Sequence, residues 1–141
     1  MMTQDGWSWS NETSIHSDKG AGQPVVRKIL DRLKQFDWDE NDIFAIHLSL
    51  EEALVNAIRH GNGYDPTKLV QVVCQLSLER CRIKITDEGK GFDPHTVPDP
   101  TDDRHLDLPS GRGVHLIRSF MSTVHYNDSG NSVTMEKVRS T

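Results

Sequence analysis

Between Lys68 and Leu78 every second residue from Val70 onward is apolar, and apolar and polar residues alternate again from Cys81 to Thr86. A period of two places successive side chains on opposite faces of a strand, so each segment has one apolar face. With Glu79–Arg80 as a tight turn, the stretch predicts a β-hairpin that is buried on one side. The apolar face would carry Val70, Val72, Cys74, Leu76 and Leu78 on the first strand and Cys81, Ile83 and Ile85 on the second.

Two helices that could cover this face are expected before the hairpin. The first starts between Asp18 and Pro24 and ends at Asp37–Trp38, with an apolar stripe on one side. The second runs from Asp39, a good N-cap, to about His60, and Asp42 stands three residues after the cap as in a capping box. Its core-facing residues would be Ile43, Ile46, Leu50, Leu54 and Ala57. Gly61–Asn62–Gly63 would end this helix.

Further elements complete the pattern. Trp7–Ile15 alternates and predicts a first strand, Val114–Met121 predicts a short helix, and Thr123–Asn127 with Ser132–Val138 predicts a closing hairpin. Asp93–Ser110 has no clear period and contains four prolines, which indicates a long functional loop. Because strands and helices are segregated along the chain, we expect an α+β fold: a two-layer α/β sandwich with a mostly antiparallel sheet.

Length and charge narrow the class of protein. The 141 residues suit a single domain over residues 1–141, with its core at about 7–139. The net charge of −5 argues against nucleic acid as the main partner. No apolar run is long enough to span a membrane and no secretory signal is visible, so a cytoplasmic protein is expected. Cys74 and Cys81 are expected as buried free thiols, too far apart along the hairpin for a disulfide.

The first candidate site lies on the second helix, where Glu52, Asn56 and His60 are spaced at i, i+4 and i+8 and so share one face. A carboxylate can accept a proton from a hydroxyl or from water. An amide oxygen one turn away is a suitable ligand for Mg²⁺. The alternative is an ordinary solvated helix face, which the helix alone does not exclude.

Two glycine-rich segments form the other candidates. In Asp87–Phe92 the Asp87 carboxylate is in phase with the inward side chains of its strand, so it needs a hydrogen-bond donor such as an adenine amino group. Gly89 and Gly91 allow close approach of the backbone to a ligand. Ser110–Gly113 precedes a helix, where free N–H groups and Arg112 favour an anion. Each segment taken alone also fits an ordinary turn or helix start.

In this order and spacing, the three motifs resemble those of the GHKL ATPases. Glu52–Gly61 (EALVNAIRHG) is similar to their N-box, Asp87–Phe92 (DEGKGF) to their first glycine box, and Gly111–Gly113 to the second. The stretch at about 93–110 stands where these proteins carry a mobile ATP lid. The short form most resembles the anti-sigma-factor serine/threonine kinases, the RsbW-like group, with agreement over roughly Trp7 to Lys137.

The resemblance implies a Bergerat-type fold that uses ATP and Mg²⁺. It implies that Glu52 is the general base, that Asn56 is the Mg²⁺ ligand and that Asp87 reads the adenine. Thr134 on the last strand would assist Asp87 through water. The residues around the nucleotide would be Gly89, Gly91, Gly111, Arg112 and Gly113. Glu51 adjoins Glu52, and only the spacing to Asn56 selects Glu52. Val114 stands where such proteins more often have Leu or Met.

The activity implied by the resemblance is phosphoryl transfer from ATP to a serine or threonine of a small antagonist protein. The same protein would sequester a sigma factor, and it would contact neither nucleic acid nor membrane directly. A homodimer is an expectation from the resemblance alone. The alternative is a non-catalytic module that binds ATP only to shape a surface for its partners.

Overall fold

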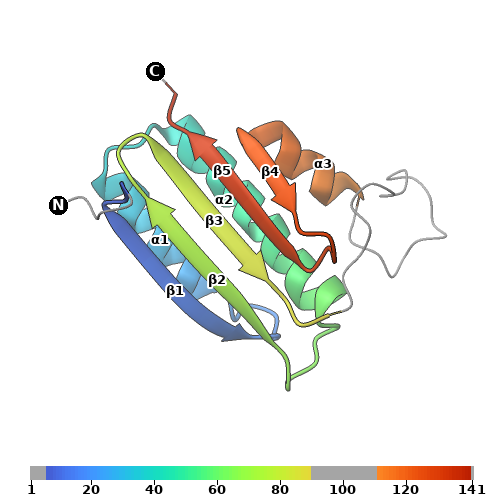
Figure 1. Cartoon of the computed structure of the whole chain (residues 1–141). Coiled ribbons are helices and arrows are strands. Elements are labelled where there is room, and N and C mark those ends of the chain that lie inside the picture. The colour runs from blue at the N-terminus through green and yellow to red at the C-terminus, as the bar shows by residue number, and fades with distance from the viewer. Residues whose placement is uncertain (1–5, 90–110, 141) are drawn as a thin grey trace.

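The computed structural model describes residues 6–89 and 111–140, which form a two-layer α+β sandwich (Figure 1). Its strands are β1 (Trp9–His16), β2 (Leu69–Leu76), β3 (Arg80–Thr86), β4 (Thr123–Tyr126) and β5 (Ser132–Val138). Its helices are α1 (Gln23–Gln35), α2 (Glu40–Val55), the π-helical segment η1 (Asn56–Gly61) and α3 (Gly111–Phe120). The expected architecture is confirmed.

The sheet has the order β1-β2-β3-β5-β4, and each neighbouring pair is antiparallel. In Figure 1 the sheet lies in front of the helices, so one sheet face is covered and the other is open. On the covered face Cys74 pairs with Ile83 and Leu76 with Cys81, and all four are buried. The predicted hairpin therefore has the predicted apolar face.

The turn of this hairpin differs from the prediction by one residue. Ser77 N–H donates to Arg80 O at 2.9 Å, and Arg80 already belongs to β3. The hydroxyl of Ser77 accepts from the N–H groups of Glu79 and Arg80, so the serine starts the turn. Leu78, expected on the apolar face, stands at the tip of the turn and is 61% exposed.

The core between the layers comes from the helix stripes. From α1 it takes Val25, Val26, Ile29 and Leu33, and from α2 it takes Ile46, Leu50 and Leu54. Ile43 is only partly buried at its edge. The apolar spacing therefore predicted which helix faces turn toward the sheet, because those faces remove the most apolar area from water.

The start of α2 is capped as predicted, but without a capping box. Asp39 accepts a hydrogen bond from Asn41 N–H at 3.0 Å. Asp42 does not turn back to the cap. It is buried and accepts from the N–H of Ser140 at 2.8 Å and from the Ser140 hydroxyl at 2.7 Å. The donors that reach Asp42 therefore come from the far end of the chain.

The two cysteines are free and buried, as expected. Cys74 pairs with Ile83 and Cys81 pairs with Leu76, so the two thiols are diagonal neighbours on one face, with main chains about 7–8 Å apart, beyond the usual reach of a disulfide. A hydrogen bond to Cys81, together with burial, raises the pKa of the Cys74 thiol. The predicted lid at 93–110 and Gly91 lie outside the described residues.

Candidate functional site

Glu52 and Asn56 lie at the C-terminal end of α2, where the helix changes type. Asn56 N–H donates to Glu52 O, so the two residues are one α-helical turn apart, and both side chains are half-buried. From Ala57 onward the hydrogen bonds widen, because Asn62 N–H donates to Ala57 O at 2.9 Å, an i→i+5 bond. Such π-helical turns often occur at functional sites. The sequence pattern predicted a continuous helix here.

The structure separates Glu52 from its neighbour Glu51. Glu51 accepts from Gln23 Nε2 of α1 at 3.2 Å and lies 3.4 Å from His47 Nε2. Its side chain is therefore held toward α1. Within the described residues the Glu52 carboxylate has no hydrogen-bond or ion-pair partner, which leaves it available to a ligand or a substrate hydroxyl. This difference agrees with the prediction that Glu52, rather than Glu51, is the general base.

Gly61, Asp87 and Gly89 meet where η1 ends and the loop after β3 begins. A Cβ on Gly61 would lie 2.3 Å from Asp87 Cγ, and a Cβ on Gly89 would lie 1.9 Å from Gly61 O. Gly89 N–H donates to Asp87 Oδ1 at 2.8 Å. Both positions therefore require glycine, because any side chain would push the carboxylate or the main chain away.

The Asp87 carboxylate is only partly satisfied. Burial raises its pKa to about 6, against the opposing effects of the Gly89 N–H bond and the Lys68 charge. Within the described residues Gly89 is its one hydrogen-bond donor. A half-buried carboxylate with an unused oxygen can bind a ligand N–H group, as the sequence position predicted.

Asn62 holds this corner of the molecule together. Its amide donates to Ser17 Oγ at 2.9 Å and to Leu69 O at 3.0 Å. Its Oδ1 accepts from Glu88 N–H at 2.8 Å, which fixes the loop next to Asp87. From the sequence, Asn62 was expected at the helix end and among the residues shared with the GHKL proteins, but these contacts to Ser17, Leu69 and Glu88 were not predicted.

Helix α3 brings the second glycine segment to the same end of the molecule. The rings of Phe44 and Phe120 lie 6.2 Å apart at 77°, so the last residue of α3 packs near the start of α2 (Figure 1). Along each helix, Gly111 is about 13 Å from Phe120 and Glu52 is about 12 Å from Phe44, at about 1.5 Å per residue. The two helices run antiparallel, and the N-terminus of α3, with Gly111, Arg112 and Gly113, therefore lies toward Glu52 and Asn56.

Thr134 is not brought to Asp87. It pairs with Lys84 on β3 and with His125 on β4, out of phase with the buried Val133 and Met135. Its side chain therefore belongs to the open face of the sheet, whereas Asp87 packs against Gly61 on the covered side. The sequence placed Thr134 on the correct strand but could not fix its face relative to Asp87.

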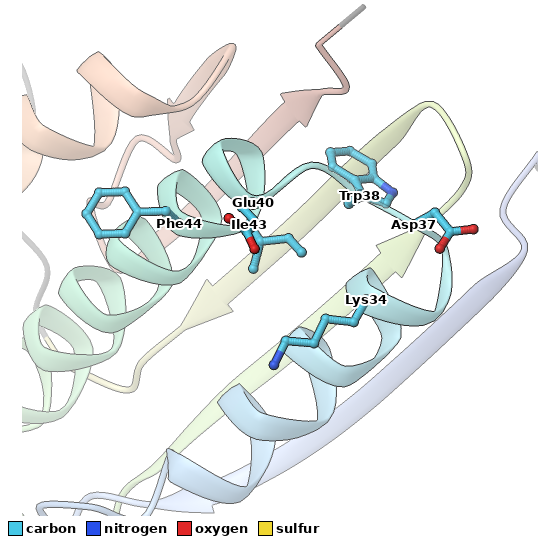
Figure 2. Close-up of a pocket in the computed structure, with 6 residues that line it drawn as sticks. All are labelled: Lys34, Asp37, Trp38, Glu40, Ile43 and Phe44. Atoms are coloured by element: carbon cyan, nitrogen blue, oxygen red, sulfur yellow. The ribbon is translucent and has the colours of Figure 1, made fainter.

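A separate hollow of about 460 Å³ lies at the opposite end of α2 (Figure 2). It is lined by Lys34, Asp37, Trp38, Glu40, Ile43 and Phe44. The two carboxylates and the single lysine give it an acidic balance, and no predicted site residue lies in it. The predicted motifs therefore gather at only one end of the helix layer.

The fold and these motifs define a nucleotide-binding class of protein, and comparison with known proteins specifies it. Residues 16–137 match the histidine kinase-like ATPase domain family. The chain is 32% identical over 111 residues to the anti-sigma F factor of Oceanobacillus iheyensis, covering 74% of this chain and 75% of that protein. It is 30% identical over 123 residues to serine-protein kinase RsbW of Bacillus licheniformis, covering 80% and 76%.

Solved structures agree on the fold. The RsbU and RsbW domains of Rv1364c from Mycobacterium tuberculosis superpose with a TM-score of 0.61 at 15% identity, over 94% of this chain and 32% of that one. The mycobacterial sensor histidine kinase MprB gives a TM-score of 0.51 at 15% identity, over 93% and 98%. The chain therefore belongs to the histidine kinase-like ATPase domain family, in its RsbW-like, GHKL-type group.

Two further features are absent from the part of the chain that the structure describes. Within residues 6–89 and 111–140, no helix has the length and apolar character that a membrane crossing requires. In the same segments no group of three or more His, Cys, Asp or Glu side chains is arranged to hold a metal ion.

Proposed function

We propose that this chain is an ATP-dependent serine/threonine kinase of the anti-sigma type, which phosphorylates a small antagonist protein and sequesters a sigma factor. One observation carries the proposal. The Glu52–Asn56 pair lies at the end of α2 that leads directly into the Gly61–Asp87–Gly89 contact. The names of the relatives, an anti-sigma F factor and a serine-protein kinase, support the same role.

The nucleotide would be bound at the corner formed by η1 and the loop after β3. The Asp87 carboxylate, held by Gly89 N–H, has an oxygen available for the adenine amino group. Gly61 and Gly89 let the main chain pack directly against the Asp87 carboxylate and the Gly61 carbonyl group, which keeps this carboxylate at the corner. The N–H groups at the start of α3, with Gly111, Arg112 and Gly113, would receive phosphate oxygens.

Asn56 would hold Mg²⁺ through its amide oxygen, together with oxygens from the phosphates and from water. A single amide ligand fits this ion, because Mg²⁺ in phosphoryl-transfer sites keeps most of its ligands from water and substrate. When bound, the ion supplies neutralisation of the phosphate charge. The half-buried side chain of Asn56 leaves its oxygen accessible for this purpose.

Glu52 would act as the general base. Its carboxylate accepts the proton of the substrate hydroxyl while that oxygen bonds to the γ-phosphorus and the bond to the leaving ADP oxygen breaks. Glu52 is suited to this because its side chain has no partner within the described residues, in contrast to Glu51. The lid predicted at 93–110 would exclude water from the nucleotide during transfer.

The proposal is tested by comparing Glu52→Gln with the matched neighbour variant Glu51→Gln. We expect Glu52→Gln to retain Mg·ATP affinity in calorimetry and to lose about 100-fold or more in transfer to the antagonist that co-purifies with the wild type. Glu51→Gln should change both little, because its carboxylate is held toward α1.

Loss of transfer in Glu51→Gln alone would move the base to Glu51. Equal loss of binding and transfer in Glu52→Gln would contradict the base role. Wild-type binding of Mg·ATP without any transfer would instead support the non-catalytic binding module.

A further inference from the structure

A polar hollow of about 410 Å³ lies on the open face of the sheet, where β3, β5 and β4 adjoin. Eight residues line it, all of them polar and none of them acidic. They include Lys84, His125, Thr134 and the hydroxyl pair Thr86–Ser132. The chain as a whole is acidic, with a net charge of −5, but the lining of this hollow has no carboxylate that would repel an anion.

Three of these side chains form one row across the strands. Lys84 pairs with Thr134, and Thr134 pairs with His125, so all three project from the same face. Strands about 4.8 Å apart place Lys84 and His125 about 10 Å apart at the main chain, on either side of the Thr134 hydroxyl. That spacing leaves room for a small tetrahedral oxyanion between the ammonium and the imidazole.

The donors of this row are unused. Within the described residues neither Lys84 nor His125 has a hydrogen-bond or ion-pair partner. The carboxylate that shares this face of β5, Glu136, is held by Arg80 at 3.3 Å and by Arg82 at 3.1 Å. The charges elsewhere on β3 and β5 are therefore paired, whereas those over Thr134 are available.

We propose that this hollow binds a phosphate group, either free or carried on a side chain of another protein. Phosphate offers only acceptor oxygens, in several directions, and the lysine, the imidazole N–H and the hydroxyls offer donors from three strands. The site is independent of the proposed kinase function, because it lies on the sheet face opposite the Gly61–Asp87 contact.

The hollow also has a direct link to Asp87. Asn131, one of its lining residues, accepts from Asp87 N–H at 2.9 Å and donates from Nδ2 to Asp87 O at 3.3 Å. The amide of Asp87 should therefore report occupancy of the hollow, even though its carboxylate lies on the other side. Because Asp87 also belongs to the proposed nucleotide site, a shift of its amide supports the hollow only together with shifts at Lys84, Thr134 and His125.

The test is a ¹⁵N–¹H NMR titration of the whole chain with inorganic phosphate, against sodium chloride at equal ionic strength. We expect saturable shifts at Lys84, Thr134, His125 and Asp87, with half-saturation on the order of millimolar, as for a small exposed ion site. Lys84→Gln should weaken binding about tenfold. Thr134→Val, which keeps the side-chain volume, should weaken it by a smaller factor.

Lys34→Gln is the matched control, since it removes one exposed lysine from the hollow with the acidic balance (Figure 2). It should leave phosphate binding unchanged. A second arm with O-phosphoserine separates the sources: binding at least as tight as phosphate indicates a phosphate carried by a protein, and binding of inorganic phosphate alone indicates the free ion. Non-saturable shifts, or equal weakening by Lys84→Gln and Lys34→Gln, would overturn the proposal.

Discussion

Two carboxylates lie at opposite ends of the continuous α2–η1 helix, and they differ in how many hydrogen-bond donors the fold provides for them. Asp42, in the first turn of α2, accepts two hydrogen bonds from Ser140 and lies 4.0 Å from the Lys137 ammonium. Asp87, packed against Gly61 beyond the last turn of η1, has Gly89 N–H as its one donor within the described residues. One acid is fully buried and paired, whereas the other is half-buried and left short of partners.

The difference agrees with a structural role for Asp42 and with the binding role that we propose for Asp87. A buried charge is stable only when donors surround it, and Ser140 with Lys137 provides them for Asp42. At Asp87 burial without enough donors raises the pKa to about 6, which means that the folded protein bears a cost for keeping this group ionised. A ligand that donates a hydrogen bond would reduce that cost, as expected for the adenine-binding role that we propose for Asp87.

The largest effect is expected from Asp42→Ala. The variant should lose about 3 kcal/mol of unfolding free energy, because the Ser140 N–H and the Lys137 ammonium lose their shared acceptor. Asp39→Ala, which removes only the N-cap of the same helix, should lose about 1 kcal/mol. Urea unfolding measures both. A smaller loss in Asp42→Ala than in Asp39→Ala would contradict the structural role of Asp42.

A smaller effect, confined to the other end, is expected from Gly61→Ala. The new Cβ would lie 2.3 Å from Asp87 Cγ, so the carboxylate or the π-helical turn must move. We expect a loss of about 1–2 kcal/mol in stability, as for overpacked sites, together with weaker Mg·ATP binding.

A double-mutant cycle isolates the Gly61–Asp87 contact. Asp87→Ala removes each of the atoms that the Cβ would meet, so Gly61→Ala should cost less stability in the Asp87→Ala background than in the wild type. An equal cost in both backgrounds would show that the clash lies elsewhere.

The smallest change in stability, and one of opposite sign, is expected from Asp87→Asn. The asparagine oxygen can still accept from Gly89 N–H, while the poorly paired charge is removed. The pKa of Asp87 is raised from 3.8 to about 6 on folding, so the wild type loses stability as the pH rises through this range. The variant should therefore melt a few degrees higher at pH 7.5, and its advantage should disappear near pH 4.

The same variant should bind Mg·ATP at least about tenfold more weakly, the factor that corresponds to about 1.4 kcal/mol. Differential scanning fluorimetry across the pH range and calorimetry with Mg·ATP give the two readouts. If Asp87→Asn is less stable than the wild type at every pH, Asp87 is not an underpaired carboxylate. If it binds ATP as tightly as the wild type, Asp87 does not bind the nucleotide.

The sequence predicted the elements well because their signals are local. The alternation in β2 and β3 and the i, i+4 spacing of Glu52 and Asn56 depend only on residues within a few positions, and the structure keeps both. The predictions that differ from the structure concern the ends of elements, where contacts with the rest of the chain also decide the local conformation. Leu78 was assigned to a strand rather than to a turn, and a continuous helix was predicted where η1 has wider hydrogen bonds.

The layers of this protein follow from its apolar periodicity, because that periodicity fixes which face of each element must leave water. The distant partners of the buried polar groups depend instead on how the elements pack. Asp42 meets Ser140 across 98 positions and Asn62 meets Glu88 across 26. Thr134 faces away from Asp87, although both belong to neighbouring strands or their ends. Apolar contacts depend mainly on area, whereas a hydrogen bond requires one particular donor at a suitable distance and angle, and for residues far apart in the sequence only the packing of the elements brings that donor into place.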